Sequence, residues 1–78
     1  MEINKMIKLK AIKSSDEING NKILRWSYNG YEFEYVNGDS KLDIKNLDGH
    51  WLPLSLNGAN NKAIAIKTIK EYLTIKEA

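Results

Sequence analysis

Side chains that could take part in acid–base or metal chemistry are few in this sequence. His50 is the only histidine, and it follows closely after Asp48, whose carboxylate could orient the imidazole. A general base must lie within hydrogen-bond reach of a nucleophile or a substrate, and the sequence offers His50 neither. We therefore interpret His50 as an exposed residue at the end of a hairpin. One imidazole and no cysteine are also too few ligands for a zinc site, so we expect no metal and no cofactor.

Paired carboxylates are the second candidate for chemistry. Glu32 and Glu34 are spaced so that they share one face of a strand, and two carboxylates in different environments can act as general acid and base. The strand pairing given below places Arg25 opposite Glu34, which favours a solvated ion pair instead. The glycines stand singly at turns, so no phosphate-binding P-loop or GxGxxG motif is present. The sequence therefore predicts a protein that is not an enzyme.

The element that positions these side chains is a hairpin centred on Asn29-Gly30. An Asn-Gly pair tolerates the two positive φ angles of a type I′ turn, and it separates two alternating runs here. With these residues as the loop, one face of the hairpin is aromatic and the other is polar. The aromatic face carries Leu24, Trp26, Tyr28, Tyr31, Phe33 and Tyr35, and the polar face carries Ile23, Arg25, Ser27, Glu32, Glu34 and Val36. The aromatic residues are thus predicted to form the core.

Further strands are expected on both sides of this hairpin. The alternation of apolar and polar residues predicts strands over roughly 5–13, 22–28, 31–36, 41–46 and 50–55, with 14–21 as the longest loop. A loop of either Asn37-Gly38 or Gly38-Asp39 puts Leu42 and Ile44 on the core face. A three-residue loop ending in a Gly49 bulge keeps Leu52 and Leu54 on that face too. Pro53 lacks an N–H donor, which predicts an edge strand.

The period changes to that of a helix near the C-terminus. Three- and four-residue spacing of Ala59, Ala63, Ile66, Ile69, Tyr72 and Leu73 predicts an amphipathic helix over roughly 59–75, capped by Asn57 or Asn60. The expected fold class is α+β, with an antiparallel meander of four to five strands and this helix packed on its apolar face. We expect residues 1–78 to form a single small domain.

The amino-acid composition indicates the cellular location and the origin of the protein more clearly than its function. Twelve basic and ten acidic side chains leave a net charge of only +2, too little to argue for nucleic acid from bulk charge. The lack of cysteine, of a signal peptide and of a long apolar run favours a cytoplasmic location without a membrane partner. Frequent Lys, Ile and Asn, which have AT-rich codons, suggest an AT-rich genome, such as that of a phage or mobile element.

The polar face of the sheet is the candidate binding surface. Trp51 is predicted to project from it, and exposed Trp and Arg are enriched at binding hot spots. The predicted partner-binding residues are Trp51, Arg25, Lys8, Lys10, Glu32, Glu34 and Lys45. The leading hypothesis is a small non-catalytic binding protein, an accessory or inhibitory factor that docks on another protein.

Two alternatives remain open from the sequence. The first is a nucleic-acid-binding module that uses the exposed sheet face and the lysines of the helix. Its predicted residues are Lys8, Lys10, Arg25, Lys45, Lys62, Lys67 and Lys70. The second is self-association through an edge strand, which would make the protein a homo-oligomer.

Overall fold

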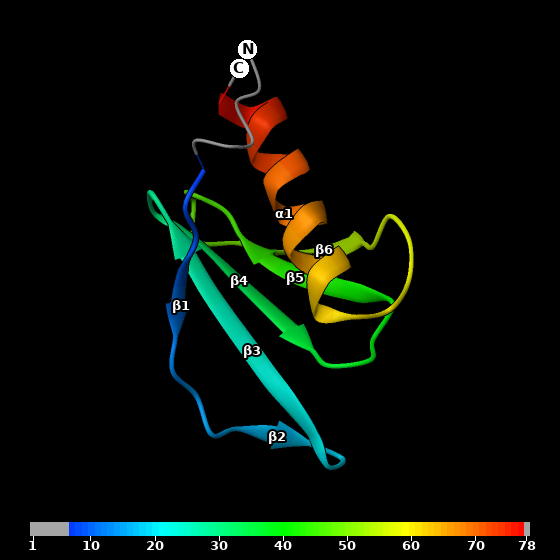
Figure 1. The fold of residues 1–78 in the computed structure, drawn as a ribbon. Helices are drawn as coiled ribbons and strands as arrows, with labels where there is room; N and C mark the ends of the chain where they lie inside the picture. The colour runs from blue at the N-terminus through cyan, green and yellow to red at the C-terminus, as the bar shows by residue number, and fades with distance from the viewer. Residues whose placement is uncertain (1–6, 78) are drawn as a thin grey trace.

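A computed structural model of the chain describes residues 7–77, in which one helix lies across one face of a sheet (Figure 1). The elements are β1 (Lys10–Ile12), β2 (Glu17–Ile18), β3 (Asn21–Tyr28), β4 (Tyr31–Val36), β5 (Lys41–Lys45), β6 (Trp51–Ser55) and α1 (Lys62–Glu77). The strands pair antiparallel in the order β1-β3-β4-β5-β6, and β2 pairs with the start of β3. The predicted α+β fold is confirmed, with six strands in place of four to five.

The central hairpin has the predicted register. Asn29 and Gly30 adopt positive φ angles of 44° and 90°, as a type I′ turn requires. Trp26 lies opposite Phe33, and Arg25 lies opposite Glu34. Phe33 and Trp26 are 1% and 4% exposed, so the aromatic face forms the core as predicted.

The β5–β6 hairpin closes through the predicted bulge. Gly49 has a φ of 84°, and its N–H donates to the Asn46 carbonyl at 2.9 Å. Ile44 then lies opposite Leu52. The pairing of Phe33 with Ile44 gives the register expected from a Gly38-Asp39 loop. The turn itself is centred on Asn37-Gly38, because the Asp39 N–H donates to the Val36 carbonyl at 2.9 Å. β6 is the last strand of the sheet, which confirms the edge position predicted for Pro53.

The helix packs on the core, but its buried stripe differs from the predicted one. Ala65, Ile69 and Leu73 are fully buried, whereas Ala63 is exposed and Ala59 precedes the helix. The side chain of Asn61 caps α1, because its Oδ1 accepts a hydrogen bond from the Ile64 N–H at 2.9 Å. The predictions of Ala59 and Ala63 in the stripe, and of Asn57 or Asn60 as the cap, were therefore wrong.

Asn57 has a different role at the start of this segment. Its N–H donates to Thr68 Oγ1 at 3.2 Å, and its Nδ2 donates to Glu71 Oε1 at 3.1 Å. Thr68 in turn donates to the Ile64 carbonyl at 2.8 Å. These bonds tie the loop after β6 to the side of the helix.

The N-terminal strand is shorter than predicted, and the expected loop after it contains a strand. Of the predicted strand over 5–13, residues 10–12 form β1 and residues 5 and 6 lie outside the described residues. Residues 14–21 include β2, which turns into β3 through Asn19 and Gly20, both at positive φ. This second Asn-Gly turn has the same signature as Asn29-Gly30.

Candidate functional site

The edge of the sheet formed by β1 and β2 contains a large bulge. Ile12 lies opposite Arg25, and Glu17 lies opposite Lys22. The four residues 13–16 therefore face only two residues of β3, Ile23 and Leu24. The Ile23 N–H donates to the Asp16 carbonyl at 3.0 Å and closes the bulge at its far end. Bulges bend a strand away from its neighbour and often lie beside binding sites.

Arg25 holds the bulge against the sheet. Its Nη1 donates to Ser14 Oγ at 2.6 Å and to Asp16 Oδ2 at 2.7 Å. Its Nε donates to Glu34 Oε2 at 3.0 Å. The hydrogen bond and charge of Arg25 lower the pKa of the Asp16 carboxyl below its ordinary value. Arg25, predicted as a partner-binding residue, thus already has three side-chain partners within the chain.

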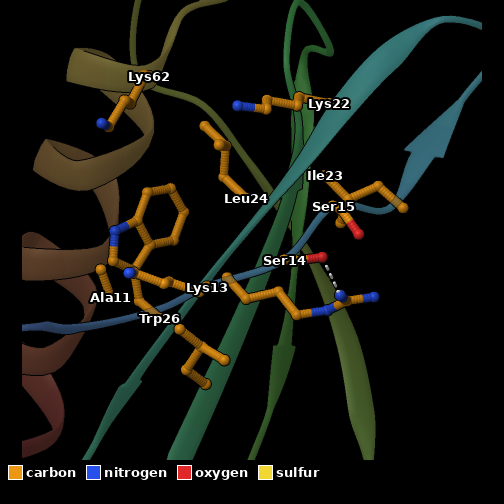
Figure 2. A pocket seen from close by; sticks show the side chains of 11 residues that line it. Ala11, Lys13, Ser14, Ser15, Lys22, Ile23, Leu24, Trp26 and Lys62 are labelled. Carbon is orange, nitrogen blue, oxygen red and sulfur yellow. Dashed lines mark hydrogen bonds between the residues drawn. The ribbon is translucent and has the colours of Figure 1, made fainter.

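A groove of about 590 Å³ opens between this bulge, β3 and the start of α1. Figure 2 shows Lys22 extending from β3 toward α1, with Leu24 and the Trp26 indole below it and Lys62 on the helix. Lys13 and Ala11 line the groove from the β1 side. The groove therefore combines an apolar wall with lysines from three different segments of the chain.

The groove has a basic character because no carboxylate lines it. Lys13, Lys22 and Lys62 form no ion pair within residues 7–77. Glu17 lies across from Lys22 in the strand register without coming within ion-pair distance of it. Asp16, the nearest acidic residue in the bulge, is paired with Arg25. Three uncompensated ammonium groups thus surround one concave surface.

Most of the partner-binding residues predicted on the sheet do share its outer face. One row across the strands runs through Lys10, Ser27, Glu32, Lys45 and Trp51. Lys45 Nζ lies 3.4 Å from Glu32 Oε2. The next row contains Arg25 and Glu34. Lys8 is exposed but precedes β1. The structure therefore gathers six of the seven residues on one face, where two of the cations are paired with acids.

Trp51 stands at the edge of this face, opposite Lys45. It is 47% exposed, and Leu52 beside it is 46% exposed. Leu47, in the turn before β6, is 65% exposed and lies against Gly30, where an added Cβ would come within 2.9 Å of Leu47 Cδ2. Trp51 lies on the outer face, whereas Leu52, opposite the buried Ile44, lies on the other face. The exposed apolar side chains at the turn end of the β5–β6 hairpin therefore do not share one surface.

The residues predicted for nucleic-acid binding lie on several elements of the fold. Lys62 lies at the groove. Lys67 follows five residues later, about 140° around the helix axis at 100° per residue. Arg25 and Lys45 are paired with Glu34 and Glu32 on the outer face. Lys70 is half-buried. Arg25 and Lys62 line the same groove, and the nucleic-acid alternative stays a prediction.

The sequence reasoning missed the groove residues Lys13, Ser14 and Lys22. The available signal was Asn19-Gly20, which predicts a tight hairpin and so brings residues before it back onto the start of β3. That hairpin pairs Glu17 with Lys22. The β1 register, continued along the chain, would place a different residue opposite Lys22. Recognising both pairings would have revealed the bulge.

Other kinds of site were also sought in the described part of the chain. No three His, Cys, Asp or Glu side chains within residues 7–77 gather as metal ligands would. In the same residues, no helix is both long and apolar enough to cross a membrane. The chain was compared with protein-family models, with curated proteins and with solved structures, and none of the three comparisons gave a match.

Proposed function

We propose that this protein is a small non-catalytic binding protein that docks on another protein through the turn end of the β5–β6 hairpin. The supporting observation is Trp51, a large aromatic side chain that is 47% exposed on the last strand of the sheet. Exposed aromatic side chains that fill a pocket on a partner contribute most of the energy of many interfaces. In this proposal the protein acts as an accessory or inhibitory factor, and its origin in a phage or mobile element rests on amino-acid composition alone.

The backbone of β6 favours contact through side chains over the addition of a strand. The Asn46–His50 and Ser40–Leu56 backbone hydrogen bonds bracket the β5–β6 ladder. Because bonded and non-bonded pairs alternate in an antiparallel ladder, Pro53 opposite Asp43 occupies a non-bonded pair. The nitrogen of Pro53 therefore faces away from β5, at the free edge, where it offers no donor to an incoming strand.

The charges of the outer face suit a protein partner better than a polyanion. Arg25 and Glu34 are paired at 3.0 Å, and Lys45 and Glu32 at 3.4 Å. A surface whose charges are paired internally neither attracts phosphates strongly nor repels a neutral apolar pocket. We infer a partner surface with an apolar pocket for Trp51 and a polar rim around it.

The test compares two exposed apolar side chains at distant positions. Trp51→Ala removes the proposed anchor, and Ile75→Ala removes a side chain on α1 that is 76% exposed. Tagged wild-type and variant proteins are used to isolate a partner from lysate of the source cells, and the affinity for the purified partner is then measured by calorimetry. A buried aromatic anchor contributes about 2 kcal/mol or more, so Trp51→Ala should weaken binding about 30-fold.

Circular dichroism spectra of both variants should match that of the wild type, because both side chains are exposed. The docking site would be refuted by an unchanged affinity of Trp51→Ala, or by an equal loss in Ile75→Ala. Steep weakening of partner binding by salt would instead point to a charged interface and count against Trp51 as the anchor.

A further inference from the structure

We propose that the groove between the bulge and α1 binds a small organic phosphate, with the phosphoryl group held by Lys13, Lys22 and Lys62 and the organic part resting on the apolar wall. This ligand site is separate from the docking surface around Trp51 and does not depend on it. The ligand class follows from the charge of the groove and from its size and lining.

The charge argument rests on the three lysines. They come from the bulge, from β3 and from the first residue of α1, and all three line the groove. Within residues 7–77 none of them has an ion-pair partner. Such a group of like charges repels itself until an anion binds between them, and a phosphomonoester brings about 1.5 to 2 negative charges and three acceptor oxygens near pH 7. Lys62 also stands where the exposed N–H groups of α1 favour negative charge.

The size and the lining of the groove indicate an organic body on the ligand. The volume of about 590 Å³ falls within the range of about 300 to 1,000 Å³ typical of small-molecule sites. Inorganic phosphate alone would leave most of it filled with water. Leu24 and Trp26 form the wall beside the lysines (Figure 2), and burying an apolar group against this wall releases that water.

Ser14 fixes the bulge at the rim of the groove. Its Oγ accepts one hydrogen bond from Arg25 at 2.6 Å and one from the Asp16 N–H at 3.1 Å. Besides the hydrogen bond and charge of Arg25, a side-chain hydrogen bond from Ser14 helps to lower the pKa of the Asp16 carboxyl. The hydroxyl of Ser14 is therefore engaged within the bulge, where it holds the wall of the groove in place.

The first experiment uses phenyl phosphate, phenol and inorganic phosphate as probes of the intact chain. Binding is followed by the fluorescence of Trp26 in the Trp51→Phe variant, which leaves Trp26 as the single tryptophan because the chain has two. Phenyl phosphate should bind more tightly than either phenol or inorganic phosphate, because only it presents both the charge and the apolar body. Equal binding of phenol and phenyl phosphate would overturn the proposal.

The second experiment removes one charge at a time. Lys13→Met and Lys62→Met remove groove lysines, and Lys67→Met removes an exposed lysine from α1 outside the groove. Each groove variant should weaken phenyl phosphate binding about threefold, and the double variant about tenfold, as expected for solvent-exposed charge pairs. Lys67→Met should weaken phenyl phosphate binding by less than either groove variant does. Equal losses in all three variants would indicate bulk charge and overturn the site.

A third measurement separates the small ligand from a nucleic acid. Adenosine monophosphate and a single-stranded oligonucleotide are titrated under the same conditions across a range of salt concentrations. If the groove holds a single phosphate group, the affinities for adenosine monophosphate and for the oligonucleotide should both decrease with salt as expected for one bound phosphate. A much tighter oligonucleotide complex, with a steep salt slope that Lys62→Met reduces by about one, would overturn the small-molecule assignment and give the groove to nucleic acid.

Discussion

The rotation of α1 about its axis can be tested by placing the same substitution at two neighbouring alanines. Ala65 is 0% exposed and Ala63 is exposed, although the sequence pattern placed Ala63 in the buried stripe. Ala65→Val and Ala63→Val each add the same two methyl groups within the first two turns of the helix. The comparison matters for function because the same rotation positions Lys62 beside the groove.

The expected difference follows from packing. Both variants lose about the same helix propensity, roughly 0.5 kcal/mol for a β-branched residue. Only Ala65→Val forces additional atoms into a site closed by the sheet, and overpacking of this kind costs about 1 to 3 kcal/mol. A domain of this length has a stability of about 4 to 12 kcal/mol at 0.05 to 0.15 kcal/mol per residue. Ala65→Val should therefore remain folded but be measurably less stable.

Urea denaturation followed by circular dichroism measures both variants against the wild type. The midpoint for Ala65→Val should fall well below that for Ala63→Val. In thermal melts the two should differ by about 4 to 8 °C for each kcal/mol of overpacking. Equal losses of stability in the two variants, or a larger loss in Ala63→Val, would refute this rotation of the helix. Ala63 and Ala65 are two residues apart, so their side chains point about 200° apart around the helix axis.

Two further predictions concern the turn after β4 and the bulge at the edge of the sheet. Tyr35→Phe removes the hydrogen bond that the buried Tyr35 hydroxyl donates to the Asp39 carbonyl at 2.7 Å, and should lower the free energy of unfolding in urea by about 1 kcal/mol; an unchanged midpoint would contradict this. Acid should open the bulge, because Arg25 lowers the pKa of Asp16 below 3.8. The stabilisation by this ion pair is complete above pH 3.8 and is lost as the pH falls through the lowered pKa. Hydrogen exchange should then show that the Ile23 amide, which donates to the Asp16 carbonyl, loses its protection at a higher pH than the Phe33 amide. Equal protection of the two amides at every pH would contradict the role of Asp16.

The strand registers could be predicted because side chains alternate with a period of two. A slip of one residue at Asn29-Gly30 would place Trp26 opposite a glutamate and on the other face from Phe33, so only one register keeps the aromatic side chains together. The same reasoning selected the Gly49 bulge, since a two-residue loop would have turned Leu52 away from the core. Both registers were confirmed by the structure.

The rotation of the helix could not be read from the sequence. Residues 63–66 read Ala-Ile-Ala-Ile, so apolar side chains surround the first turns and several faces would serve for docking. The contacts of the sheet decide between them: Tyr72 meets the ring of Tyr31 edge-on at 6.2 Å, and Ala65 allows a close approach where a larger residue would not.

The candidate groove was also beyond the sequence pattern, for a different reason. Lys13, Ser14 and Ser15 have no periodicity, and they come together with Lys62 only because the chain leaves the β1 register and returns at β2. Arg25 stabilises this detour through Ser14 and Asp16. A long-range contact of a single side chain leaves no local signal in a sequence.

The two proposed sites lie at opposite edges of the same sheet, which makes them separable. Trp26 pairs with the buried Phe33 on the side covered by α1, whereas Trp51 pairs with Lys45 on the outer face. Arg25 is the side chain that links the two faces, because it joins Glu34 on the outer face to the bulge that walls the groove. A ligand that orders the bulge could therefore influence partner docking through Arg25, which also lines the groove. If Lys62→Met changes the affinity for phenyl phosphate and leaves partner binding unchanged, the faces act independently, and Arg25 has a structural role rather than a signalling one.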